Sequence, residues 1–161
     1  MGSSDGECWP YGRRPKPDWA EEFTGELKSI TINAPMDPNP DGSVPTGRSD
    51  RLLLQAELVK RMKLAHQGRV SPDEYEQVRW GDAVVELKFP RPGHEHGWHY
   101  RLYTGVPKPP DHDYLVWLGA GRKPDDQYDP EGAWRTSQTD QIDTSEQRFK
   151  VWINARFASR L

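Results

Sequence analysis

The stretch AVVELKFPRPGHEHGWHYRLYTGVPKPPDHDYLVWLGAG, residues 83–121, decides the fold. It contains three runs rich in β-branched and aromatic residues, at 83–89, 98–106 and 113–121. Residues of these types favour strands, and Pro- and Gly-rich turns follow the first two runs. Because the separating turns are short, an antiparallel meander is the economical topology.

A helical hairpin is expected before this stretch. Residues 51–67 carry apolar side chains at helical spacing, and Gly68 follows as a stop. Residues 71–74, SPDE, resemble a capping box with Pro at the first helical position, which predicts a short second helix through Val78.

Three further segments flank these elements. Residues 27–33, LKSITIN, are rich in β-branched side chains and predict a strand. Residues 35–45 contain four prolines, so they predict a long loop. Residues 143–161 continue an apolar stripe at helical spacing and predict a terminal helix with Thr144 as its N-cap.

The length of 161 residues suits a single domain. We expect residues 1–49 to form an N-terminal extension that ends in the Pro-rich loop and includes the strand at 27–33, and residues 50–161 to form the core. The predicted fold class is α+β, with a small antiparallel or mixed sheet of about four strands packed on the helical hairpin and the C-terminal helix.

Charge and cysteine content limit the function and the compartment. The net charge of −3 argues mildly against global attraction to nucleic acid, although residues 51–69 are basic and residues 125–146 are acidic. The single cysteine, Cys8, cannot form an internal disulfide and suggests a reducing compartment. With no apolar signal core or membrane-length apolar run, we expect a cytoplasmic protein without a membrane partner.

The order of the elements and four local stretches resemble the RelE/ParE superfamily of small bacterial toxins, especially its HigB-like, phage-associated branch. The stretches are AVVELKF, which is similar to a strand with Glu-Leu-Arg, then HYRLYTGVP, YLVWLGAGRKPDD and TDQIDTSEQRFKVWINAR. They lie within residues 50–158, and residues 1–49 have no counterpart. The resemblance implies a RelE-like fold. Members of this superfamily commonly cleave mRNA in the ribosomal A site, others poison gyrase, and some have lost toxicity.

Cleavage of RNA by its 2′-hydroxyl needs a base, an acid and cations that stabilise the charged transition state. The resemblance assigns Arg101 to the family's Tyr-Arg strand, and Arg122 and Lys123 to the basic pair after the last strand. His99 has the strand parity of Arg101, and we expect Lys88, Arg101 and Arg122 to converge on one sheet face. The expected catalytic residues are His99, Arg101, Arg122 and Lys123, and the expected substrate-binding residues are Lys88, Tyr103 and Tyr128.

Each of these residues also has a structural interpretation. Arg101 is then a strand arginine paired with Glu86 across the sheet. Arg122 and Lys123 are then a solvated turn, His99 is a half-buried strand residue, and Lys88 is an exposed strand lysine. The sequence leaves both interpretations open.

The histidines of GHEHGWH, residues 93–99, raise the question of a metal site. His94, His96 and His99 with the intervening Glu offer nitrogen and oxygen ligands. The flanking glycines Gly93 and Gly97 favour a turn, whereas the His-Glu-x-x-His zinc pattern requires a helix. We therefore expect no physiological metal and no cofactor.

The leading hypothesis is a toxin-like, metal-independent endoribonuclease that cleaves mRNA at the ribosome, arrests growth and is neutralised by a helix-turn-helix antitoxin. The alternative is a non-catalytic protein of the same fold, phage-encoded, that binds and inhibits a host protein through its Trp-containing N-terminal arm. A gyrase poison is a third, weaker hypothesis. The acidic balance of the chain departs from the basic character usual for ribosome-directed toxins.

Overall fold

The computed structural model describes residues 14–45, 47–89 and 95–161. Its strands are β1 (Lys16–Trp19), β2 (Tyr75–Arg79), β3 (Val84–Phe89), β4 (Trp98–Gly105) and β5 (Tyr114–Pro124). Its helices are α2 (Phe23–Ile30), α3 (Arg48–His66) and α4 (Trp134–Ser159), with the 3₁₀ turns η1 (Pro72–Glu74), η2 (Glu95–Gly97) and η3 (Asp126–Tyr128).

The strands form one mixed sheet in the order β1-β5-β4-β3-β2. Strands β3, β4 and β5 are antiparallel neighbours in chain order, which confirms the meander predicted from residues 83–121, and β2 adds a further antiparallel strand beside β3. Strand β1 pairs parallel with β5. The predicted α+β class is confirmed, with five strands in the described residues where about four were expected.

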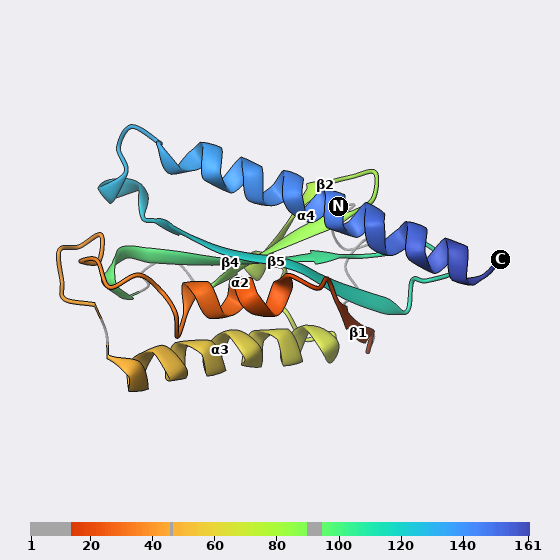
Figure 1. Ribbon diagram of the computed structural model, residues 1–161, viewed down its shortest axis with the longest axis horizontal. Coiled ribbons are helices and arrows are strands. Elements are labelled where there is room, and N and C mark those ends of the chain that lie inside the picture. The colour runs from red at the N-terminus through yellow and green to blue at the C-terminus, as the bar shows by residue number, and fades with distance from the viewer. Residues whose placement is uncertain (1–13, 46, 90–94) are drawn as a thin grey trace.

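Helices cover both faces of the sheet (Figure 1): α2 and α3 lie on one face and α4 lies on the other. Alternate side chains of β2 to β5 point toward the two cores, as the pleat of a strand requires. The core under α2 and α3 includes Phe23, Leu58, Met62, Leu102 and Trp117. The smaller core under α4 consists of Val84, Tyr103, Val116, Leu118 and Phe149.

The strand predicted at residues 27–33 is wrong, because residues 23–30 form α2. Phe23, Leu27 and Ile30 recur at helical spacing and are all buried, so one helix face packs on the sheet. This burial outweighs the β preference of the Ile and Thr side chains. Residues of the expected N-terminal extension thus contribute β1 and α2 to the same sheet and core.

The second helix predicted after residues 71–74 is also wrong. The segment makes the short turn η1 and then enters β2, and Ser71 makes no capping hydrogen bond. Tyr75 and Gln77 are buried while Glu76 between them is exposed, which is the period-two pattern of a strand. Helix α2, which shares a core with α3, is therefore the second helix on that face.

Two other predictions concern helices and a loop. The helix expected at 51–67 is confirmed as α3. The loop expected at residues 35–45 is also confirmed, because these residues, all of which the structure describes, form no helix or strand. Thr144 is not an N-cap, because α4 begins at Trp134. Instead the carboxylate of Asp129 accepts hydrogen bonds from the backbone N–H groups of Ala133 (2.9 Å) and Trp134 (3.1 Å).

An ion pair covers the part of the β5 edge that the short β1 leaves open. Glu26 of α2 accepts a hydrogen bond from the Ala120 backbone N–H (3.2 Å), and Arg148 of α4 donates one to the Leu118 carbonyl (2.8 Å). Glu26 and Arg148 are joined by two hydrogen bonds of 2.8 and 2.7 Å. The hydrogen bonds that Arg148 donates to the Glu26 carboxylate raise the pKa of Arg148, so this guanidinium stays charged. The pair therefore satisfies edge groups that a longer β1 would have bonded.

Candidate functional site

Five of the seven side chains expected in the site lie on the α4 face of the sheet. The cross-strand pairs are Lys88 with Arg101 and His99 with Lys123, and Tyr103 pairs with Glu86. Paired residues project to the same face, and His99, Arg101 and Tyr103 share it because they alternate along β4. Fold topology thus brings residues that are far apart in sequence onto one surface.

Arg122 lies on the opposite face. It pairs with Tyr100, which is buried under α2 and α3, and its guanidinium carbon lies 3.9 Å from the centroid of the Trp98 ring. Burial lowers the pKa of Arg122 from its usual value. The expectation that Arg122 converges with Lys88 and Arg101 is therefore wrong. Its neighbours Gly121 and Lys123 project to the α4 face, and adjacent residues of a strand project to opposite faces.

Arg101 is buried and paired with Glu86, as its structural interpretation predicted. Their exposed fractions are 7% and 2%, and Arg101 Nε lies 3.3 Å from Glu86 Oε1. Arg101 Nη1 also donates to the Tyr100 carbonyl (3.0 Å), and Glu86 accepts a hydrogen bond from Gln138 of α4 (2.9 Å). The pair is enclosed between the sheet and α4, so a substrate does not reach Arg101 in this arrangement.

Tyr103 is also enclosed under α4. Its hydroxyl donates a weak hydrogen bond to Gln141 Oε1 at 3.3 Å, and its side chain belongs to the fully buried part of the core. Burial, assisted by the nearby Glu86 carboxylate, raises the pKa of Tyr103 above its usual value. The hydroxyl therefore remains protonated and serves as a donor.

The remaining cations lie nearer to solvent. Lys88 Nζ is 2.9 Å from Glu76, and Lys123 Nζ is 3.7 Å from Asp126. His99 is held by Asp125, with 2.9 Å between Nε2 and Oδ2.

The four basic side chains of the expected site that lie on this face, Lys88, His99, Arg101 and Lys123, thus each contact a carboxylate. The sequence reasoning identified residues 125–146 as an acidic segment but did not recognise Asp125 as the partner of His99.

Tyr128 lies in η3, at the end of the sheet where β4 begins. Its ring packs against Gly97, where an added Cβ would lie 2.7 Å from Tyr128 Cε2. Gly97 has a φ of +82°, so both its conformation and this close contact favour glycine. The Tyr128 side chain is exposed on its other side.

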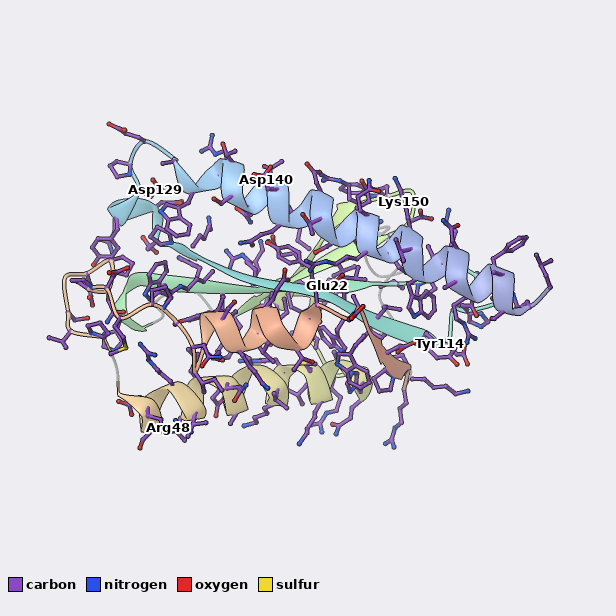
Figure 2. All side chains as sticks on the ribbon, viewed as in Figure 1. Glu22, Arg48, Tyr114, Asp129, Asp140 and Lys150 are labelled. Carbon is purple, nitrogen blue, oxygen red and sulfur yellow. The ribbon has the colours of Figure 1, made fainter. Side chains whose placement is uncertain are left out.

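An open cavity of about 570 Å³ lies between the end of β5, η3 and the start of α4. The residues that line it are Lys123, Asp126, Asp129, Pro130, Glu131, Gly132, Trp134, Arg135 and Gln138. Figure 2 shows the side chain of Asp129 beside the loop that leads into α4. Only Lys123 of this set was expected in the site, because the cavity exists only once α4 folds back over the sheet.

The basic segment 51–69 lies away from this site. It forms α3 and the residues that follow, on the other side of the sheet (Figure 1). Lys60, Lys63 and Arg69 are exposed and make no ion pair within the described residues, whereas Arg61 pairs with Glu74. The local basic face that the sequence left open is therefore separate from the candidate site.

The histidines of residues 93–99 do not lie together at the candidate site. His94 lies outside the described residues. His96 Nδ1 lies 3.1 Å from the Ser43 hydroxyl and 3.7 Å from Asp41, so it contacts the Pro-rich loop. Among residues 14–45, 47–89 and 95–161, no group of three or more His, Cys, Asp or Glu side chains is placed to hold a metal ion.

Comparison with known proteins adds no relative. No family model matches the chain, and the searches of curated proteins and of solved structures gave no match. In the described part of the chain, no helix has the length and apolar character needed to cross a membrane. The class of protein established by the fold is therefore α+β with a mixed five-stranded sheet.

Proposed function

We propose that the chain is a metal-independent endoribonuclease of the RelE-like kind, acting on mRNA at the ribosome through the α4 face of its sheet. The observation that carries this proposal is the row of Lys88, His99 and Lys123 on one face, with His99 held by a carboxylate at 2.9 Å. A cytoplasmic location, expected from the sequence composition, and a helix-turn-helix antitoxin, implied by the resemblance, belong to the same proposal.

The proposed chemistry is attack of a ribose 2′-oxygen on the adjacent phosphorus. The P–O bond to the 5′-oxygen breaks, and the products are a 2′,3′-cyclic phosphate and a 5′-hydroxyl. His99 takes part in proton transfer and Asp125 orients its ring, since imidazole exchanges protons near neutral pH. The 2′-hydroxyl proton leaves to a base, and the 5′-oxygen receives a proton. Lys88 and Lys123 stabilise the charge that grows on the phosphate.

The exposure of the carboxylates determines which cations are available to RNA. Asp126 and Glu76, the partners of Lys123 and Lys88, have side chains 97% and 58% exposed. Such surface pairs contribute roughly 0–1 kcal/mol, so an RNA phosphate can replace them. Glu86 is only 3% exposed and remains with Arg101. We therefore assign Arg101 a positioning role, in contrast to the catalytic role expected from the sequence.

The second candidate is a non-catalytic protein of this fold that binds a host protein. It is favoured by the carboxylate that each of Lys88, His99, Arg101 and Lys123 contacts, because these acidic partners offset the positive charge that would attract RNA. The overall charge of −3 points the same way. This candidate predicts a purified protein that binds a partner and leaves RNA intact.

Induced expression with growth measurement and mapping of RNA ends tests the proposal. We expect growth arrest and new 5′-hydroxyl ends, both reduced at least tenfold by Lys123→Met and by His99→Ala. The matched control is Lys150→Met, because Lys150 is exposed on α4 and makes no ion pair within the described residues (Figure 2). Intact message with the wild-type chain would support the non-catalytic candidate, and cleavage unaffected by both site variants would place the active site elsewhere.

A further inference from the structure

We propose that the cavity at the start of α4 is a nucleotide-binding subsite in which Trp134 stacks on a base of single-stranded RNA. This inference rests on the proposed function for its substrate, because Lys123 belongs both to the cavity and to the row of candidate site residues. A nucleotide in the cavity would therefore lie next to the phosphate that is cleaved.

Trp134 is a preorganised aromatic platform. It is the first residue of α4, and its backbone N–H donates to the Asp129 carboxylate. Its ring meets Trp98 nearly perpendicularly, with the ring centroids 5.8 Å apart, yet 38% of the residue remains exposed. Stacking on an exposed aromatic ring is a general way to hold a base of any sequence.

Trp98, which supports Trp134, is itself fixed on two sides. The guanidinium of Arg122 lies over its ring, and its indole N–H donates to Asn39 Oδ1 (3.1 Å). This arrangement gives Arg122 a role that the sequence did not indicate: it positions Trp98, and through it Trp134, from the opposite face of the sheet. Such support restricts the ring before a ligand arrives, which lowers the entropy lost on binding.

The polar groups of the cavity complement a nucleotide. Arg135 is exposed and makes no ion pair among the described residues, and Lys123 lines the same cavity. Together they provide two cations for a phosphate. Gln138 also lines the cavity, and its side-chain N–H group donates to Glu86. Its amide oxygen can therefore accept from a base edge.

The acidic residues of the lining do not prevent this assignment. Asp129 is occupied by the backbone N–H groups at the start of α4, and Asp126, whose side chain is 97% exposed, can turn into solvent when a phosphate replaces it at Lys123. Glu131 is left as an exposed carboxylate. The volume of about 570 Å³ falls in the range of roughly 300–1,000 Å³ usual for small-ligand sites.

The test is binding of a fluorescent single-stranded RNA oligonucleotide that carries 2′-O-methyl groups throughout. This probe cannot undergo 2′-hydroxyl attack, so its affinity is measured by fluorescence anisotropy without cleavage. We expect Trp134→Ala to weaken binding about tenfold, the change that 1.4 kcal/mol represents, and Trp134→Phe to retain most of the affinity. Arg135→Gln should also weaken binding and make it less sensitive to salt.

The matched control is Trp80→Ala. Trp80 is an exposed tryptophan in the turn between β2 and β3, where Val84 pairs with Gly105, at the end of the sheet opposite Trp98. Equal affinities of the Trp134→Ala and Trp80→Ala proteins, or no binding by the wild type, would overturn the inference. The far-ultraviolet circular dichroism of each variant verifies that α4 is intact.

Cleavage of unmodified RNA, measured in parallel, separates this inference from the proposed function. If RNA binding depends on Trp134 but no RNA is cleaved, the subsite is supported and the proposed nuclease activity is wrong. If Trp134→Ala changes neither cleavage nor binding, the nuclease activity is supported and the subsite is wrong.

Discussion

Replacing Arg101 by methionine separates a structural role from a catalytic one. The substitution keeps a long side chain but leaves the Glu86 carboxylate, whose side chain is only 3% exposed, without its cationic partner, while the Gln138 amide still donates to it. Removing one partner of a buried ion pair typically lowers the free energy of unfolding by about 3–5 kcal/mol. For a domain of this size, each kcal/mol corresponds to roughly 2–4 °C, so we expect the melting temperature to fall by about 6–20 °C.

Urea denaturation of three proteins measures the effect: wild type, Arg101→Met, and the double variant Arg101→Met with Glu86→Leu. The double variant should recover most of the lost stability, since replacing both partners of a buried pair by apolar residues is often neutral. An unchanged urea midpoint in Arg101→Met would refute the argument that the pair is buried and coupled. If that stable variant also lost RNA cleavage, Arg101 would be a catalytic residue and the positioning role assigned to it would be wrong.

Two further predictions concern stability. His66 accepts a hydrogen bond from the Trp117 indole N–H (2.8 Å), and burial lowers its pKa in the folded protein below the ordinary value of about 6.5. The unfolded state therefore binds more protons than the folded state just below pH 6.5. The contribution of His66 to the free energy of unfolding is fully present above that pH and is lost as the pH falls below it. His66→Gln should flatten the dependence of the urea midpoint on pH just below about 6.5; the same slope in both proteins would contradict the assignment. Separately, a Cβ at Gly105 would lie 2.7 Å from the buried Phe149 ring, so Gly105→Ala should cost about 1–3 kcal/mol. Gly81→Ala is its control, because a Cβ there has no neighbour within 4 Å, and equal midpoints for the two variants would show that the ring yields without cost.

Local patterns in the sequence predicted the antiparallel meander because period-two alternation and short turns act within a few residues. They failed at residues 23–30, where two signals compete. Ile30, Thr31 and Ile32 favour a strand, whereas Phe23, Leu27 and Ile30 define a helix face. Packing of that face against the sheet decides the outcome, and a local propensity contains no information about it.

Within the candidate site, the sequence could predict only which residues of a single strand share a face of the sheet. Parity placed His99 and Arg101 on one face, and the cross-strand alternative for Arg101 named its partner Glu86 correctly. The face of Arg122 depends on the register between β4 and β5, which opposes Arg101 to Gly121. No pattern within a single strand contains that register.

Trp134 and Arg135 could not be assigned for a related reason. Their role depends on α4 crossing back over the end of β5, a contact between distant segments. The sequence signal that was available is a tryptophan and an arginine within an otherwise acidic segment, directly after Gly132 and Ala133. Without the fold, that signal is equally typical of a solvated helix start.

The ion pairs on the α4 face predict how RNA binding should depend on salt concentration. An RNA strand that reaches the α4 face must replace the exposed carboxylates Glu76 and Asp126, each of which holds its lysine weakly. Salt weakens both the surface ion pairs and the attraction of the phosphates. A nuclease of this design should therefore bind RNA with a shallow salt dependence, set by about two or three phosphate contacts. A steep dependence would instead indicate that the strand lies on exposed cations such as Lys60 and Lys63 of α3, away from His99, which make no ion pair with any residue that the structure describes.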